Sequence, residues 1–105
     1  VGHFLDGKAS LVVGTHTHVP TNDARILKKG TGYMTDAGMC GDYDSVIGMD
    51  KNNSINKFLK EDAKKHFPSK GESSICGVIV NICKETGLAL DVKKFIAGGV
   101  LSSDI

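Results

Sequence analysis

One sequence feature most constrains the fold of this chain. It is a short apolar run that breaks at a glycine and leads into two histidines. Leu11–Val13 has the composition of a buried strand, and Gly14 ends it. His16 and His18 are separated by one residue, so in extended backbone their side chains point to the same side. Open α/β sheets place their sites just beyond the carboxyl ends of strands. Imidazole is a common ligand of zinc, iron and manganese. The pattern therefore predicts a metal site at His16 and His18.

The same spacing also suits a structural interpretation without a metal. Two histidines in a polar loop, each hydrogen-bonded to backbone, would give an identical His-x-His pattern. A strand and a glycine precede the pair, and a threonine stands on either side of His16. We favour the metal site for these reasons.

Composition indicates one small domain and excludes several classes of function. A chain of 105 residues with 40% hydrophobic and 24% charged residues is typical of a soluble globular protein with a modest core. A net charge of +1 gives no reason to expect a nucleic acid polymer or a membrane surface as partner. No apolar run approaches the ~20 residues of a membrane span.

The three cysteines are odd in number and lack Cys-x-x-Cys spacing, which argues against a disulfide framework or a zinc knuckle. Cys76 and Cys83 are seven residues apart and should face opposite sides of a strand, so we expect no bond between them. No signal peptide is visible. We therefore expect reduced thiols and a cytoplasmic protein.

The amino-terminal third predicts a helix end, the strand and a hairpin. Val1–Lys8 reads as the tail of a helix that stops at Asp6-Gly7, with His3 as a surface or packing residue. Ala24–Leu27 and Tyr33–Thr35 are short strand candidates on either side of a glycine-rich turn, which predicts a hairpin.

A helix and a second hairpin are predicted further along the chain. Apolar residues recur at helical spacing, and Asn52–Ser54 supplies residues typical of helix caps. We expect the helix to end at Pro68 and to carry two ion pairs from Glu61. The apolar positions are Ile55, Phe58, Leu59, Ala63 and Phe67, and the pairs are Glu61–Lys64 and Glu61–Lys65.

The last third has β character. Ile75–Cys83 is rich in valine and isoleucine, and Leu88–Ile96 alternates apolar and polar residues. The Lys84–Gly87 turn between them completes a predicted hairpin.

Gly14–Pro20 resembles the closing histidine motif of calcineurin-like metallophosphoesterases. The similarity continues through Thr35–Gly41 and Tyr43–Met49, and the hairpin Gly77–Ile96 also fits. This combination resembles one bacterial branch, the 2′,3′-cyclic-nucleotide 2′-phosphodiesterases, and covers essentially the whole chain.

The resemblance implies an α/β (α+β) fold in which residues 1–105 form a single partial domain, the C-terminal portion of a four-layer αββα sandwich. It implies a two-metal site, with iron or manganese preferred and zinc as a further option, that hydrolyses cyclic nucleotides or related phosphodiesters. His16 and His18 match the last two metal ligands of the family. Asp36, Gly38, Met39 and Ser45 match loop positions to which we assign no role beyond shaping the site.

The remaining ligands of the family lie upstream of this motif, and no residue here matches them; His3 falls on the helix tail. Two imidazoles cannot hold a dinuclear centre. We therefore expect the C-terminal fragment of a metal-dependent phosphodiesterase, with little or no catalysis by itself. Its expected partners are a missing N-terminal half and, once the site is completed, a small phosphodiester substrate.

Two alternatives remain open. The chain is either a non-catalytic interaction module that self-associates, or a small mononuclear metal-binding protein with Asp36 as a further candidate ligand beside the two histidines. Self-association is expected because a bared half-sandwich exposes sheet edges and apolar faces. Ile75, Val78 and Val80 are the candidates for the shared surface.

Overall fold

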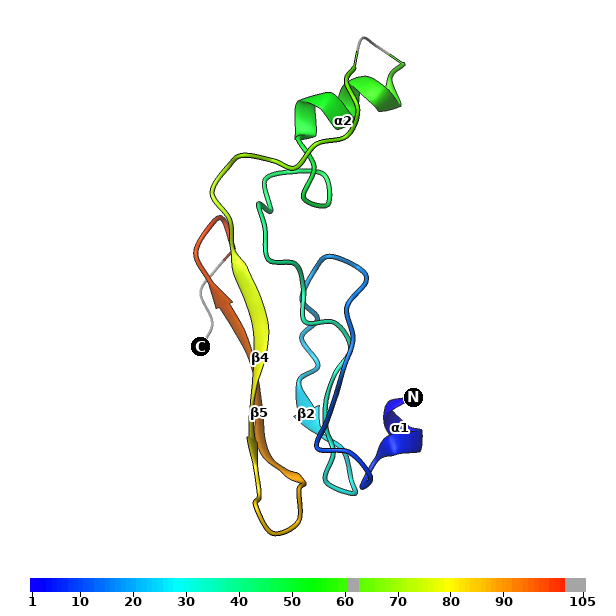
Figure 1. The fold of residues 1–105 in the computed structure, drawn as a ribbon, viewed down its shortest axis with the longest axis vertical. Helices are drawn as coiled ribbons and strands as arrows, with labels where there is room; N and C mark the ends of the chain where they lie inside the picture. Colours follow the sequence, from blue (N-terminus) through cyan, green and yellow to red (C-terminus); the bar gives the residue numbers. More distant parts are fainter. Residues whose placement is uncertain (61–62, 102–105) are drawn as a thin grey trace.

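The computed structural model describes residues 1–60 and 63–101, which form short helices and two β-sheets (Figure 1). One sheet has the strand order β1-β3-β2, and the other is the two-stranded pair β4-β5. The predicted α/β fold class is confirmed. The elements are α1 (Gly2–Leu5), β1 (Leu11–Val13), β2 (Arg25–Ile26), β3 (Gly32–Met34), α2 (Lys51–Phe58), β4 (Ile75–Ile82) and β5 (Ala89–Ala97).

The three-stranded sheet contains the predicted hairpin and a parallel pair. Strand β2 runs antiparallel to β3, with Ile26 opposite Gly32. Strand β1 runs parallel to β3, with Val13 opposite Met34. Because parallel strands end at the same edge of a sheet, the loop after Val13 and the loop after Met34 begin side by side.

The second sheet is the predicted closing hairpin, with Val80 opposite Val92. The three cysteines are free, so the expected absence of a bond between Cys76 and Cys83 is confirmed. Val78 and Val80 share the face that carries Val92. Ile75 is an odd number of positions from both valines and therefore lies on the opposite face. The three residues expected to form one shared surface therefore do not lie on one face.

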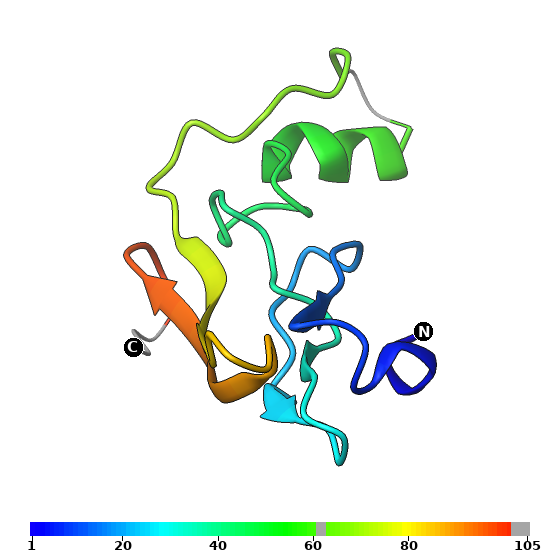
Figure 2. The ribbon, with the colours of Figure 1, turned by 60° about the horizontal axis from the view of Figure 1, so that its bottom comes forward.

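The two sheets pack against each other around Gly32. A Cβ atom at Gly32 would lie 2.7 Å from Val92 Cγ2 and 3.3 Å from Ala89 Cβ, so the missing side chain allows β3 and β5 to approach (Figure 2). Met34 is fully buried in this region. The buried apolar side chains of the described residues are Leu27, Met34, Cys76, Ala89 and Ile96.

The chain is elongated and exposes much of its surface. Its extents are 58 × 27 × 17 Å and its radius of gyration is 17.2 Å, whereas about 13 Å is expected for a compact domain of this length. Its accessible surface of 7069 Å² exceeds the ~5,700 Å² expected for a compact monomer of this mass. Helix α2 stands apart from both sheets at one end of the molecule (Figures 1 and 2).

Helix α2 is shorter than predicted and begins earlier. Its N-cap is Asp50, whose side chain accepts a hydrogen bond from the Asn53 N–H at 3.0 Å. The helix ends at Phe58, and Lys60 adopts a left-handed φ of 59° that stops further helical turns. The predicted start at Asn52–Ser54 and the predicted end at Pro68 are therefore wrong.

Residues 63–67 fold back along the helix in non-helical conformation. Asn53 is buried, and its side-chain oxygen accepts the Lys64 N–H at 2.8 Å while its amide donates to the carbonyl groups of Lys64 and Lys65. The Asp50 N–H donates to the carbonyl of Phe67. These bonds hold the returning segment, so Ala63 and Phe67 do not extend the helical face. The predicted Glu61–Lys64 and Glu61–Lys65 pairs lie outside the described residues.

Within residues 1–60 and 63–101, no helix has the length and apolar character that crossing a membrane requires.

Candidate metal centre

The histidine loop leaves the sheet at Gly14. The Gly14 N–H donates to the Met34 carbonyl at 3.2 Å, and the Gly14 carbonyl accepts from the Ala37 N–H at 2.9 Å. A Cβ atom at this position would overlap the carbonyl oxygen of Thr35. Glycine is therefore required where β1 passes into the loop, because the backbone of the neighbouring strand occupies the space of a side chain.

Asp36 holds the histidine loop against the loop that follows β3. Its Oδ2 accepts hydrogen bonds from the His16 N–H at 2.9 Å, the Thr17 N–H at 2.7 Å and the Thr17 hydroxyl at 2.8 Å. Its Oδ1 accepts the Gly38 N–H at 2.8 Å. The N–H of Thr17, followed by that of Gly38, lowers the pKa of Asp36 to about 2. The carboxylate is ionised at neutral pH, and donors occupy both of its oxygens.

His18 is oriented by a contact from another part of the chain. Its Nδ1 lies 3.0 Å from the carbonyl oxygen of Ile47. Since a carbonyl only accepts, this contact assigns the ring proton to Nδ1 and leaves the lone pair of Nε2 free. Histidines that bind metals are typically held in this way, with the second ring nitrogen donating to a carbonyl or carboxylate.

The turn that delivers this carbonyl is built by Ser45. Its hydroxyl accepts the Gly48 N–H at 2.8 Å and donates to the carbonyl of Asp42. Ile47 has a left-handed φ of 47° within the turn. Ser45, which the sequence assigned only to a loop, therefore shapes the part of the chain that contacts His18.

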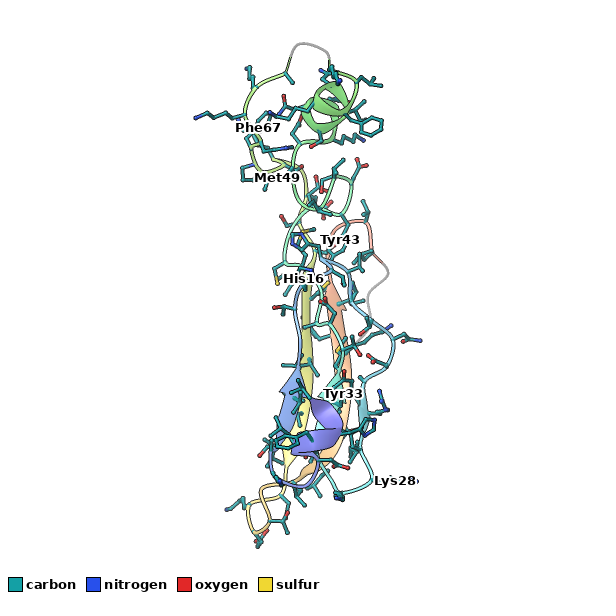
Figure 3. All side chains as sticks on the ribbon, turned by 90° about the vertical axis from the view of Figure 1, so that its right-hand side faces the viewer. His16, Lys28, Tyr33, Tyr43, Met49 and Phe67 are labelled. Carbon is teal, nitrogen blue, oxygen red and sulfur yellow. The ribbon has the colours of Figure 1, made fainter. Side chains whose placement is uncertain are left out.

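Both histidines line one hollow of about 360 Å³, together with Thr15, Gly38 and Met39. His16 lies about midway along the molecule, between the end marked by Phe67 and the end marked by Lys28 (Figure 3). The two residues line the same hollow, but the predicted extended backbone is wrong, because His18 has a left-handed φ of 68°. Metal binding by the two residues stays a prediction.

Tyr43 fixes the wall of the hollow that Met39 forms. Its hydroxyl accepts the Met39 N–H at 2.7 Å, donates to the Met39 carbonyl at 2.8 Å and lies 3.3 Å from the sulfur of Cys76. Burial and then the Cys76 thiol raise the pKa of Tyr43 to about 12. Sequence reasoning missed this role, because a single tyrosine in a glycine-rich loop has no periodicity to indicate a contact.

The donor set fits part of a metal site. One free Nε2 and a second exposed imidazole at the same hollow are suitable ligands for zinc, iron or manganese. The described part of the chain contains no group of three His, Cys, Asp or Glu side chains placed to hold an ion. Asp36 lies next to the loop but has its oxygens occupied, which argues against the mononuclear alternative in which Asp36 is a further ligand. His3 is exposed and lies in a different hollow, with Arg25 and Lys28.

The chain is similar to phosphodiesterases and phosphatases over most of its length. It is 42% identical over 96 residues to the 2′,3′-cyclic-nucleotide 2′-phosphodiesterase of Bacillus subtilis, covering 91% of this chain and 36% of that protein. It superposes on the crystal structure of a phosphatase from Mycoplasma pneumoniae with a TM-score of 0.82 and 34% identity, covering 92% of this chain and 35% of that one.

A crystal structure of a hypothetical protein from Thermus thermophilus is equally similar, with a TM-score of 0.81, 37% identity and 93% and 38% of the two chains covered. The chain thus spans little more than a third of the length of these relatives. The model of the YmdB-like protein family matches residues 1–95. The predicted resemblance is confirmed, and the chain belongs to the YmdB-like protein family.

Proposed function

We propose that this chain supplies the two-histidine part of a divalent metal site in a phosphodiesterase that hydrolyses cyclic nucleotides or related phosphodiesters. One observation carries the proposal: His16 and His18 line one hollow in a chain that is 42% identical to a 2′,3′-cyclic-nucleotide 2′-phosphodiesterase. The free Nε2 of His18 supports a ligand role. We favour iron or manganese as the metal, with zinc as a further option.

The proposed reaction class rests on the relatives, a phosphodiesterase and a phosphatase, and is one that a metal held by imidazoles could serve. A pair of divalent ions, when bound, would supply positive charge to the phosphoryl oxygens and an activated water as nucleophile. The residues described here present the two imidazoles and hold them in place through Asp36 and the Ile47 carbonyl. The proposal requires further ligands from elsewhere, either from an additional segment of a longer polypeptide or from another copy of this chain. By itself the chain has little or no activity.

A segment exchange tests the proposal. The matching 96 residues of the Bacillus enzyme are replaced by this chain, and hydrolysis of a 2′,3′-cyclic nucleotide and bound metal are measured. We expect a chimera that hydrolyses the substrate, and loss of both activity and about one metal ion per chain in H16A and H18A variants. A folded chimera whose metal content is unchanged by either substitution would contradict the ligand role.

We also propose a non-catalytic property, self-association through the outer face of the β4-β5 hairpin. Ile75 and Ile79 lie on this face and are exposed, and Phe95 shares it by register, as does Lys93 opposite Ile79. Apolar residues grouped on one sheet face favour a partner that covers them.

For the compartment we propose the cytoplasm, a reducing environment, which the three unpaired thiols support. Cell fractionation with an antibody against the chain tests this, and recovery outside the cytoplasmic fraction would contradict it.

A further inference from the structure

A single side chain connects both loops that line the histidine hollow. The carboxylate of Asp36 is almost completely buried, with 2% of the residue exposed. It accepts the N–H groups of His16 and Thr17 from the loop after β1, and the N–H of Gly38 from the loop after β3. His16 and Gly38 both line the hollow, so one carboxylate fixes two of its walls.

The backbone of Asp36 closes the far end of the same loop. The carbonyl of Asp36 accepts the Thr21 N–H at 3.0 Å, and its own N–H donates to the Thr21 hydroxyl at 3.0 Å. The segment 16–21 is therefore bound to Asp36 at both ends. His18, between these anchors, has only a limited range of positions.

We infer that Asp36 is a positioning residue for the metal ligands, setting the direction in which His16 and His18 present their imidazoles. The inference rests on the proposed function for what the imidazoles bind. The geometry does not favour a ligand role for Asp36 itself, because the residue is buried and four donors point at its two oxygens. Asp36 acts on the position of the imidazoles through the backbone of the histidine loop.

Asparagine is the informative replacement, because it has the same shape but only one accepting oxygen. In D36N the amide nitrogen must face either the Gly38 N–H or the three donors of His16 and Thr17. Either orientation places a donor against a donor, so one of the two loops must move.

Asp6 provides a matched control at another site. Its carboxylate is also buried and accepts backbone N–H groups, from Lys29 and Thr31, at a hollow separate from that of the histidines. D6N therefore removes a comparable set of hydrogen bonds without touching the histidine loop.

The experiment compares wild type, D36N and D6N as full chains by NMR and by Mn²⁺ titration. In D36N we expect amide exchange at His16 and Thr17 to rise at least about tenfold, altered ¹⁵N signals of both imidazoles, and Mn²⁺ affinity about 10–100-fold lower. D6N should leave the amide exchange, the imidazole signals and the Mn²⁺ affinity as in wild type. If D36N fails to fold, T17V, which removes the hydroxyl donor to Asp36 together with the contacts of that hydroxyl with the Val19 backbone, should shift the same signals by less.

The outcomes separate this inference from the proposed function. Unchanged exchange and unchanged imidazole signals in D36N, or in T17V when D36N is unfolded, would overturn the positioning role. Failure of the wild-type chain and of the chimera to bind metal would overturn the proposed function, whereas changed imidazole signals in D36N would still support positioning.

Discussion

The carbonyl oxygen of Ile47 lies 3.0 Å from Nδ1 of His18, across 29 residues of sequence. In the neutral imidazole this contact favours the tautomer with its proton on Nδ1, so that Nε2 carries the lone pair. The turn that carries Ile47 is therefore part of the site, although none of its side chains is a candidate ligand.

Removing the Ser45 hydroxyl should loosen this turn. In S45A the Gly48 N–H loses its acceptor, so the Ile47 carbonyl no longer has a fixed position. We expect the ¹⁵N signals of His18 to report a mixture of tautomers and Mn²⁺ affinity to fall about tenfold. NMR of the imidazole and calorimetric titration measure the two effects.

Ser54 is a matched control for this substitution. Its hydroxyl is buried in α2 without a hydrogen-bond partner among the described residues. S54A should leave the His18 signals unchanged and should be neutral or stabilising, because no hydrogen bond is lost. Equal behaviour of S45A and S54A would contradict the role of the turn.

Replacing Gly14 should destabilise the fold where the histidine loop begins. The new methyl group of G14A would overlap the Thr35 carbonyl, and the backbone must move to admit it. We expect a loss of about 1–3 kcal/mol in the free energy of unfolding, as for other overpacked sites. Urea unfolding measures this loss.

Gly77 in β4 is the comparison for Gly14, because a Cβ atom there meets nothing within 4 Å. G77A should be tolerated. If both alanine variants lose the same stability, the close approach at Gly14 has no special importance.

The stability of the chain should decrease in acid through Asp23. The hydroxyl of Thr35, followed by that of Thr21, lowers the pKa of Asp23 from 3.8 to about 2. Since this pKa is lower in the folded than in the unfolded state, the carboxylate stabilises the fold above about pH 4. That contribution disappears as the pH falls through about 2.

The D23N variant isolates this effect from the other carboxylates. Its Tm should lie below that of wild type at pH 7, and the difference should shrink between pH 4 and pH 2. A difference that stays constant over this range would show that the charge of Asp23 is not responsible.

Charge on the outer face of the β4-β5 hairpin should disrupt self-association. I75K places an ammonium group in the proposed apolar interface, and light scattering at micromolar concentration should then report a monomer where wild type reports a dimer. L59K is the control. Leu59 and Ile75 are similarly exposed, at 58% and 57%, but Leu59 follows α2 and lies outside the proposed interface. A monomeric wild-type chain would refute the proposal.

The parts of the fold that local patterns specify could be predicted from the sequence. Alternation and turn residues identified both hairpins, and the glycine break after Leu11–Val13 identified the loop that carries His16 and His18. Each of these signals lies within about ten residues, which is the range over which side-chain periodicity reports structure.

The contacts that complete the site could not be predicted in this way. Asp36 reaches the His16 N–H across 20 residues, and hydrogen bonds between a side chain and distant backbone leave no periodic trace. The apolar spacing predicts a longer helix than α2 for a related reason. The side chain of Asn53 binds the backbone at Lys64, and this hydrogen bond competes with continuation of the helix. The apolar residues up to Phe67 keep their helical spacing in the sequence, so the pattern gives no sign of the competition.

The elongated shape also has a consequence for stoichiometry and lifetime of association. The accessible surface of 7069 Å² is about 1,400 Å² more than a compact monomer of this mass exposes. If a partner covers that surplus and contributes an equal area, the interface buries roughly 2,800 Å² in total, a size characteristic of permanent rather than transient complexes. An uncovered surface of that size would be large enough for the self-association proposed above to be long-lived.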